Sequence, residues 1–187
     1  PRQFDRDEVL DKAIVLFWQQ GYEATGVAQL SETLGIGKQS LYGTFGDKRG
    51  LYIAAIQRYS DESVAMIRAL FTRPGRAVDH IAELLDEWAA RASGKEYCGC
   101  FLANSCSELG TRDPEVAAVL QSKLARMTDL FQAAIERAQN EGDIAPDTNA
   151  QALARALVNT GQGLSTASKV DPGFARDTID QVRRLLC

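Results

Sequence analysis

Histidine is almost absent from this chain, whose 187 residues include a single one, His80. A Ser-His-Asp set is therefore possible only around that residue, and an imidazole-rich metal site is excluded. The four cysteines do not fill the gap, because the sequence has no C-x-x-C pair to complete a four-ligand zinc site. The sequence predicts no metal, no cofactor and no enzyme.

Long apolar runs are also missing. No run approaches the roughly 20 residues that a membrane-spanning helix needs, and no signal-peptide pattern opens the sequence. We therefore expect a cytoplasmic protein with no membrane partner. The composition, 45% hydrophobic and 25% charged, is that of an ordinary globular protein.

The chain has no excess of positive charge, since its 25 acidic residues outnumber its 21 Lys and Arg and the formal net charge is −4. A chain of this charge is a poor candidate for binding nucleic acid over its whole surface, because phosphates require local positive potential. Within residues 36–50, however, Lys38, Lys48 and Arg49 stand against one acid, Asp47. This short stretch can still form a small basic face.

The alternating pattern of strands is absent, and helical periodicity runs through the whole chain, which predicts an all-α fold of about nine helices. The first helix is expected to end at Gly21, and the second to start with Thr25 as its N-cap and to end at Gly35. A third, very short helix should run from about residue 38 to 45. Asp47 can then cap a long fourth helix.

Further start and stop signals divide the rest of the chain. Arg73-Pro74-Gly75 ends the fourth helix, and residues 97–109 are expected to form a cysteine-rich apolar helix. Asp113-Pro114-Glu115 combines an Asp N-cap, proline at the first position and an acid in the first turn, which strongly predicts a helix start. Asp147 and Asp171 are expected to open the last two helices.

A short helix, a tight turn containing glycine and a second short helix form a helix-turn-helix pattern around residues 30–45. Leu41 and Phe45 would hold the second helix to the domain and leave a polar outer face for a DNA major groove. A plain helical hairpin in an all-α core gives the same spacing. On the first interpretation the residues that contact DNA are Thr25, Lys38, Gln39, Ser40, Tyr42, Thr44 and Lys48.

From Leu10 to Leu51 the sequence resembles the N-terminal domain of TetR-family transcriptional regulators. The matching residues are Ala13-Ile14-x-x-Phe17, Gly21-Tyr22-x-x-Thr25 and Leu34-Gly35-Ile36-x-Lys38-x-Ser40-Leu41-Tyr42-x-x-Phe45-x-x-Lys48-x-x-Leu51. Two positions depart from the family pattern. Gly37 removes a side-chain cap from the third helix, and Gly43 removes a side chain that reaches DNA in relatives.

The resemblance implies a DNA-binding homodimer, a repressor rather than an activator, whose helix over residues 38–45 enters the major groove of an inverted-repeat operator. It implies a three-helix helix-turn-helix domain over residues 1–49. Residues 50–187 would form a larger helical domain for ligand binding and dimerisation, with the last two long helices pairing in a four-helix bundle.

The resemblance also implies a small-molecule effector held among the middle helices. The candidate lining residues are apolar or aromatic for the most part, which suits a hydrophobic or aromatic ligand. For each of them taken singly, the sequence favours a plain core residue over a ligand contact. They are Trp88, Tyr97, Phe101, Asn104 and Met127.

The cluster of Cys98, Cys100 and Cys106 allows several interpretations. Buried free cysteine commonly packs as a small hydrophobe, and the run from Gly99 to Asn104 resembles a segment of one branch of the family, which favours packing for Cys100. A thiol that senses oxidants or electrophiles is the first alternative. An all-α thiol-dependent reductase is a remote one, because such enzymes use C-x-x-C. On one continuous helix the i, i+6 and i, i+8 pairs are too far apart for a disulfide.

The helix expected to start near Asp147 combines small residues with apolar ones that exceed what one subunit is expected to cover. This pattern predicts a homodimer with a large apolar interface. The small residues are Ala156, Gly161 and Gly163, and the apolar ones are Leu153, Leu157 and Leu164.

Overall fold

The computed structural model describes residues 4–94 and 98–186, and in this part of the chain it contains helices and no strand. The all-α prediction is confirmed. None of the described helices is long and apolar enough to cross a lipid bilayer. The helices are α1 Arg6–Gln20, α2 Val27–Leu34, α3 Lys38–Phe45, α4 Lys48–Phe71, α5 Ala77–Ala92, α6 Phe101–Leu109, α7 Pro114–Glu141, α8 Ala150–Ala167 and α9 Gly173–Leu186.

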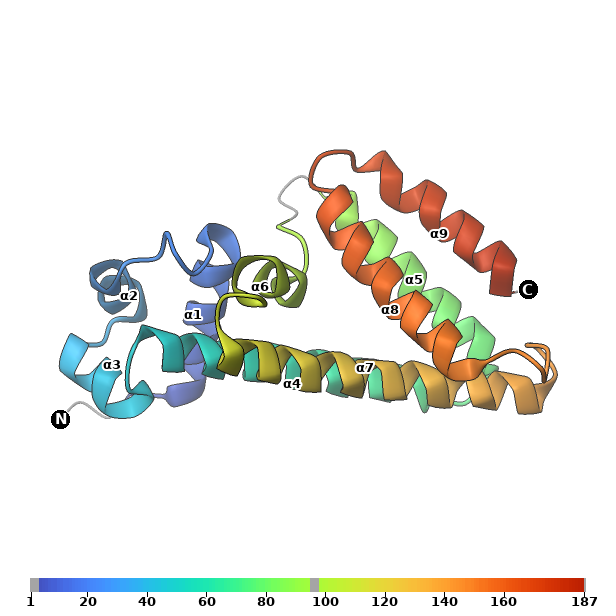
Figure 1. The fold of residues 1–187 in the computed structure, drawn as a ribbon, viewed down its shortest axis with the longest axis horizontal. Coiled ribbons are helices and arrows are strands. Elements are labelled where there is room, and N and C mark those ends of the chain that lie inside the picture. The colour runs from blue at the N-terminus through green and yellow to red at the C-terminus, as the bar shows by residue number, and fades with distance from the viewer. Residues whose placement is uncertain (1–3, 95–97, 187) are drawn as a thin grey trace.

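The molecule is elongated, with two groups of helices joined by a long pair (Figure 1). Helices α4 and α7 pack side by side along its length. Helices α1, α2 and α3 gather at one end and are called the head below. Helices α5, α8 and α9 pack together at the other end, and α6 lies between the two groups, in contact with α1, α4, α7 and α8.

The helix ends follow local chemistry where the sequence signal was strong. Asp47 caps α4 by accepting the N–H of Gly50 at 2.7 Å, and Asp113 caps α7 by accepting two backbone N–H groups at 3.0 Å each, just before Pro114. Gly35, at φ 68°, ends α2 in the left-handed conformation that glycine adopts without steric cost. These predicted boundaries are confirmed.

Two predicted helix starts are wrong. Helix α6 begins at Phe101 and not at residue 97, because Gly99 has φ 83° and breaks the helical path. Helix α8 begins at Ala150, where the Asn149 side chain accepts the N–H of Ala152 at 2.9 Å. The capping residue is therefore Asn149, two positions beyond the expected Asp147.

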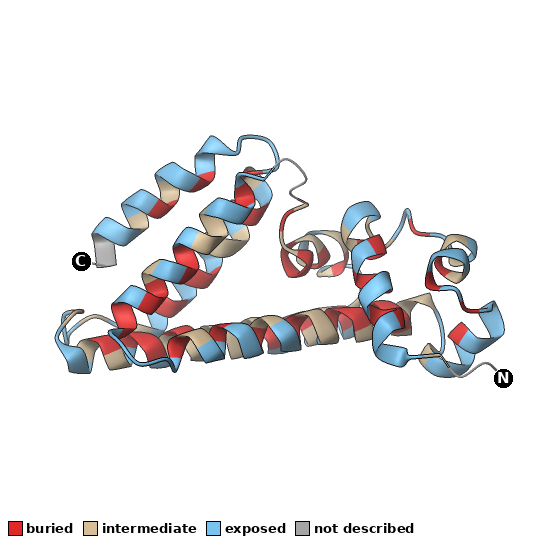
Figure 2. Cartoon of the chain, turned by 180° about the vertical axis from the view of Figure 1, so that it is seen from behind, coloured by how far each residue is buried: buried red, intermediate tan, exposed pale blue. Residues whose placement is uncertain are grey.

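The apolar interior forms two clusters, and buried residues line the inner sides of both helix groups (Figure 2). The first cluster joins the head to α6 and to the start of α7. Its centre includes Tyr52, which is 1% exposed and whose Oη donates to Ser105 Oγ at 2.8 Å, and Phe101, also 1% exposed. Packing is thus continuous across the expected domain boundary between residues 49 and 50.

Candidate functional sites

Helix α3 is anchored by its inner face and presents its outer face to solvent. Leu41 is fully buried in the head, and Ile36 and Leu34 in the preceding turn and helix are buried beside it. The eight residues of α3 span about 12 Å, the width of a DNA major groove. The exposed residues of α3 include Lys38, Gln39, Ser40, Tyr42 and Thr44.

The two unusual glycines leave α3 open on its outer side. Gly37 is the N-cap of α3 and provides no side-chain hydrogen bond, and a Cβ added at Gly43 would meet nothing within 4 Å. The position of α3 therefore depends on Leu41 and on the turns that flank the helix, not on its own capping.

Two positively charged side chains lie near the C-terminal end of α3. Lys48, in the first turn of α4, holds its Nζ 4.2 Å from the centroid of the Tyr22 ring, and the Arg6 guanidinium lies 5.5 Å from the centroid of the Phe45 ring. Such cation–π contacts fix the direction of a charged side chain without removing its charge. Lys48 thus remains at the start of a helix, where backbone N–H groups also favour anions.

Thr25 does not have the expected role. It is fully buried, and its Oγ1 donates to the carbonyl of Gly21 at 2.6 Å. The N-cap of α2 is Gly26 and makes no side-chain hydrogen bond. The predicted cap is wrong because the Thr25 hydroxyl closes the turn behind it instead of reaching forward into α2. Its side chain is not offered at the surface.

Helix α6 and the residues just after it are tied directly to the head and to the start of α4. The Glu108 carboxylate accepts the backbone N–H groups of Tyr22 and Glu23 at 2.9 Å each. Asp113 forms a two-point ion pair with Arg49, the residue after Lys48. The Arg49 hydrogen bond, followed by the N–H groups of α7, holds the pKa of Asp113 well below its usual range.

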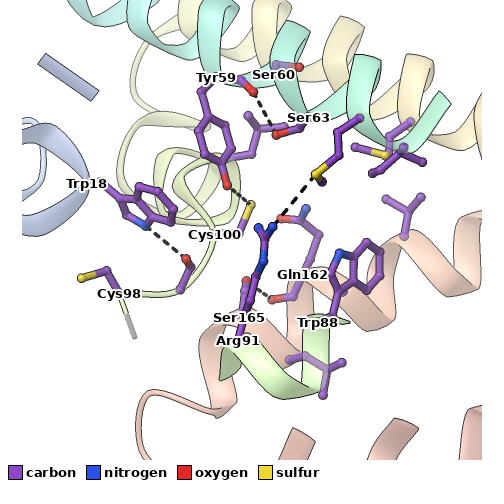
Figure 3. A pocket seen from close by; sticks show the side chains of 18 of the residues that line it. Trp18, Tyr59, Ser60, Ser63, Trp88, Arg91, Cys98, Cys100, Gln162 and Ser165 are labelled. Carbon is purple, nitrogen blue, oxygen red and sulfur yellow. Dashed lines mark hydrogen bonds between the residues drawn. The ribbon is translucent and has the colours of Figure 1, made fainter. Parts of the chain in front are cut away.

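A cavity of about 710 Å³ lies between the head and helices α4 to α8, which together with α9 are called the body below. Its walls come from α1, α4, α5, α6, α7 and α8 and from the segment that leads into α6. Three aromatic side chains, Trp18, Tyr59 and Trp88, point toward it from three different helices (Figure 3). A mostly apolar cavity of this size with a few polar groups is typical of a small-molecule site.

The predicted lining residues divide into separate groups. Trp88 and Met127 line the cavity. Phe101 is instead a core residue of the first apolar cluster, which joins the head to α6. Asn104 stabilises the chain locally, because its Nδ2 donates to the Cys98 carbonyl at 3.0 Å and its Oδ1 accepts from Lys169 at 2.6 Å. Tyr97 lies outside the described residues.

The cysteines do not share one helix, so the expectation of a single cysteine-rich helix over residues 97–109 is wrong. Cys98 and Cys100 precede α6 and line the cavity, and the Tyr59 hydroxyl donates to Cys100 Sγ at 3.8 Å. Cys106 lies within α6, where burial raises the pKa of its thiol. Cys187 is outside the described residues. No group of three or more potential metal ligands occurs in the part of the chain that the structure describes.

Several cavity residues were not predicted from the sequence. Trp18 belongs to the head, Tyr59 follows the buried stripe of α4, and Arg91 and Gln162 look like ordinary surface residues in sequence. No local signal identifies them, because they meet only through tertiary packing. Gly161 offered one weak clue, since a small residue in a helix can admit a large partner, here Trp88.

An exposed second helix behind a glycine turn, fixed to a body that encloses an apolar cavity, defines a helix-turn-helix regulator with a ligand-sized site. The comparisons agree. The family model "Bacterial regulatory proteins, tetR family" matches residues 9–55, and "Tetracyclin repressor-like, C-terminal domain" matches residues 77–184. The chain belongs to the TetR family of transcriptional regulators. It is therefore a DNA-binding regulator and not an enzyme, as predicted.

Individual relatives cover nearly the whole chain. The HTH-type transcriptional repressor ComR of Escherichia coli (strain K12) is 36% identical over 173 residues, which are 90% of this chain and 81% of that protein. The HTH-type transcriptional regulator YezE of Bacillus subtilis (strain 168) is 32% identical over 183 residues, 96% of this chain and 94% of that protein. A solved structure of the TetR-family regulator CifR, a cysteine mutant complexed with a 26bp double-strand operator DNA, is 32% identical with a TM-score of 0.83 and covers 98% of both chains.

Proposed function

We propose that this chain is a homodimeric repressor that binds an inverted-repeat operator and is released when a small hydrophobic or aromatic molecule occupies the cavity. Two findings on relatives support the first part: ComR is named a repressor, and the CifR structure contains operator DNA. Because the partner would be operator DNA, we place the protein in the cytoplasm. Ligand response is inferred from this chain's own cavity.

The observation that carries the proposal is that one wall of the cavity belongs to the head. Trp18, on α1, lines the cavity, and its Nε1 donates to the carbonyl of Gly99 at 3.1 Å. A bound molecule would therefore touch the DNA-binding unit and the body at the same time. A ligand that fits one relative position of these units better than another shifts their equilibrium by its differential affinity.

In this proposal α3 reads DNA, and its flanks hold the phosphate backbone. Base edges would be contacted from the exposed side of α3 by Gln39, Ser40 and Thr44, while Lys38, Tyr42 and Lys48 would contact phosphates. Two copies of α3 related by a two-fold axis would read half-sites about one helical turn apart, or a multiple of that. Thr25 supports this arrangement through the turn that it closes.

Dimerisation would use α8 and α9. Val170 is 90% exposed and Phe174 52% exposed at the connection between these helices, and apolar side chains this exposed suit a subunit interface. The exposed Ala156 and Gly163 would allow close approach. Of the other interface residues expected from the sequence, Leu157 and Leu164 are buried within the subunit, Leu153 is partly buried, and Gly161 packs against Trp88.

The experiment is binding-site selection from random duplex DNA with the full chain, combined with sedimentation at micromolar concentration. The proposal expects a dimer and an enriched inverted repeat. A stable monomer, or a selected pool without sequence preference, would contradict it.

A second candidate function is sensing through a thiol, because Cys98 and Cys100 line the same cavity as the aromatic residues. The solved structure of the related CifR with operator DNA is that of a cysteine mutant. Cys106 is the weaker candidate in this chain, since burial raises its pKa and thiolate is the reactive form. Thiol labelling of the native protein, with operator binding measured after oxidation and again after reduction, tests this candidate. Cysteines that resist labelling until the protein unfolds would eliminate it.

A further inference from the structure

The described lining of the cavity contains one charged side chain, Arg91, and neither an Asp nor a Glu. All its other described members are apolar, aromatic or neutral and polar. The interaction of two charges grows as water is excluded from the space between them. Once a ligand fills the cavity, the charge of Arg91 would therefore attract an anionic group and disfavour a cationic one.

Arg91 has hydrogen-bond donors to spare. Its Nη2 donates to Oε1 of Glu87, one turn earlier on α5, and lies 4.0 Å from Sδ of Met66. Its Nε and Nη1 make no hydrogen bond with the described residues. The side chain points into the cavity between Cys100 and Gln162 (Figure 3). A guanidinium has five donors in a planar fork, so Arg91 can bind a second carboxylate while it keeps Glu87.

Helix α6 begins at the cavity wall, close to the Arg91 side chain. Cys100 is its N-cap, lines the cavity and makes no side-chain capping hydrogen bond. The positive end of a helix dipole and the first backbone N–H groups favour anions at such a terminus. Ser60, another lining residue, is 2% exposed, and its Oγ has no partner in the described part of the chain. It is a buried hydroxyl that a polar ligand group could satisfy.

The hydroxyl of Tyr59 lies where the charge of Arg91 and the first backbone N–H groups of α6 both act. Burial raises the pKa of its hydroxyl, and the neighbouring Cys100 raises it further. The backbone N–H of Phe101 and the charge of Arg91 act in the opposite direction, because both favour negative charge at the phenol oxygen. The start of α6 and the guanidinium therefore act on one point of the cavity wall.

The remaining wall suits an apolar body. Trp88 and Met127 lie alongside Leu124 and Val158, on α5, α7 and α8. These side chains provide aromatic, thioether and aliphatic surface.

We propose that the effector is an apolar molecule with a single carboxylate, and that Arg91 recognises this carboxylate beside the start of α6. The proposal rests on the proposed ligand response and names the chemistry of its ligand. A charge-assisted hydrogen bond distinguishes an acid from its neutral isostere by about ten-fold in affinity.

The test compares carboxylates with their primary amides: 1-naphthoate with 1-naphthamide, octanoate with octanamide, and 4-phenylbutanoate with 4-phenylbutanamide. Both tryptophans of the chain, Trp18 and Trp88, line the cavity, so quenching of intrinsic fluorescence reports binding there directly. The proteins are the wild type, Arg91→Gln and the control Arg68→Gln, which removes an exposed charge on α4. The Arg91 side chain is 56% exposed, so its replacement should leave the fold intact.

For the wild type and the control, we expect at least one acid to bind about ten-fold more tightly than its amide. In Arg91→Gln this ratio should fall to about one while the amide keeps its affinity. The proposal is overturned if amides bind as tightly as acids, if Arg91→Gln retains the preference, or if no member of any pair binds. An acid preference without loss of operator affinity would leave the carboxylate site standing and count against ligand release instead. If only the neutral amides released operator DNA, ligand release would stand and the carboxylate site would be ruled out.

Discussion

Trp88 on α5 packs against the backbone of α8 at Gly161. A Cβ added at Gly161 would lie 2.5 Å from Cζ3 of the Trp88 indole, closer than real Cβ atoms approach other heavy atoms. The absence of a side chain at residue 161 is thus what lets the indole line the cavity in its present position. The rest of the ring packs on Phe131, with the two ring centroids 5.8 Å apart.

Gly161→Ala should therefore destabilise the protein, although alanine is the better helix former. The gain in helix propensity is up to about 1 kcal/mol. The displacement of a rigid indole from a packed site costs about 1–3 kcal/mol. Urea denaturation should show a lower free energy of unfolding, and tryptophan emission should shift. The matched control is Gly43→Ala on α3, where the added Cβ meets nothing within 4 Å and stability should rise. Equal gains in both variants would contradict this account of Gly161.

Glu108→Gln should weaken operator binding from a distance. The Glu108 carboxylate holds two backbone N–H groups in the turn between α1 and α2, whereas a glutamine side chain has one acceptor oxygen and directs an N–H₂ group at the other donor. We expect a loss of about 1–3 kcal/mol in unfolding free energy, together with weaker binding to all DNA sequences. Glu32→Gln, at an exposed position on α2, is the control. An unchanged operator affinity in Glu108→Gln would mean that the turn does not position α2.

The pair formed by Arg49 and Asp113 predicts a pH dependence. The pKa of Asp113 is lower in the folded protein, so its contribution to stability is complete above the unfolded value of about 3.9 and is lost as the pH falls toward the folded value. Asp113→Asn retains a capping side chain for α7 and loses the charge. The wild type should be more stable at pH 7 by up to about 1 kcal/mol, and this difference should shrink below about pH 4 in denaturant titrations. A difference that stays constant with pH would show that the cap alone matters; Asp129→Asn controls for loss of an exposed acid.

Two substitutions in the head should affect DNA binding differently. Lys48→Ala should weaken binding to every sequence and reduce the salt dependence by about one unit of slope, because one phosphate contact is lost. Gln39→Ala should relax the preference at one position of each half-site, at a cost of about 1–3 kcal/mol for the preferred base. Measurement of both variants on the selected operator and on single-base variants, over a range of salt, separates these roles. A loss of base preference in Lys48→Ala would reverse the assignment.

The sequence was sufficient wherever structure follows from neighbouring residues. The caps Asp47 and Asp113, the glycine end of α2 and the bounds of α3 depend on side chains that contact backbone within a few positions. Thr25 shows the limit of such reasoning. A threonine before a helix can cap forward or bond backward, and in this protein the Gly21 carbonyl lies within reach of its hydroxyl.

The cavity could not be predicted in the same way. Trp18, Tyr59, Arg91 and Gln162 lie far apart in the chain and meet only through the tertiary packing of α1, α4, α5 and α8. The start of α6 was also missed, since periodicity continues through Cys98 and Cys100 while Gly99 turns the backbone out of the helix. Residues that line a cavity and residues that fill a core have the same periodicity in sequence.

The most direct test of the central claim is the affinity of the dimer for its selected operator, measured by fluorescence anisotropy with the cavity empty and then saturated. The ligand is the apolar carboxylate that quenches tryptophan fluorescence at the lowest concentration, and saturation is followed by that quenching. If occupation of the cavity controls the head, operator affinity should fall about ten-fold or more, and operator DNA should weaken ligand binding by the same factor, because the coupling is reciprocal. An operator affinity that is unchanged while the cavity is saturated would contradict the account.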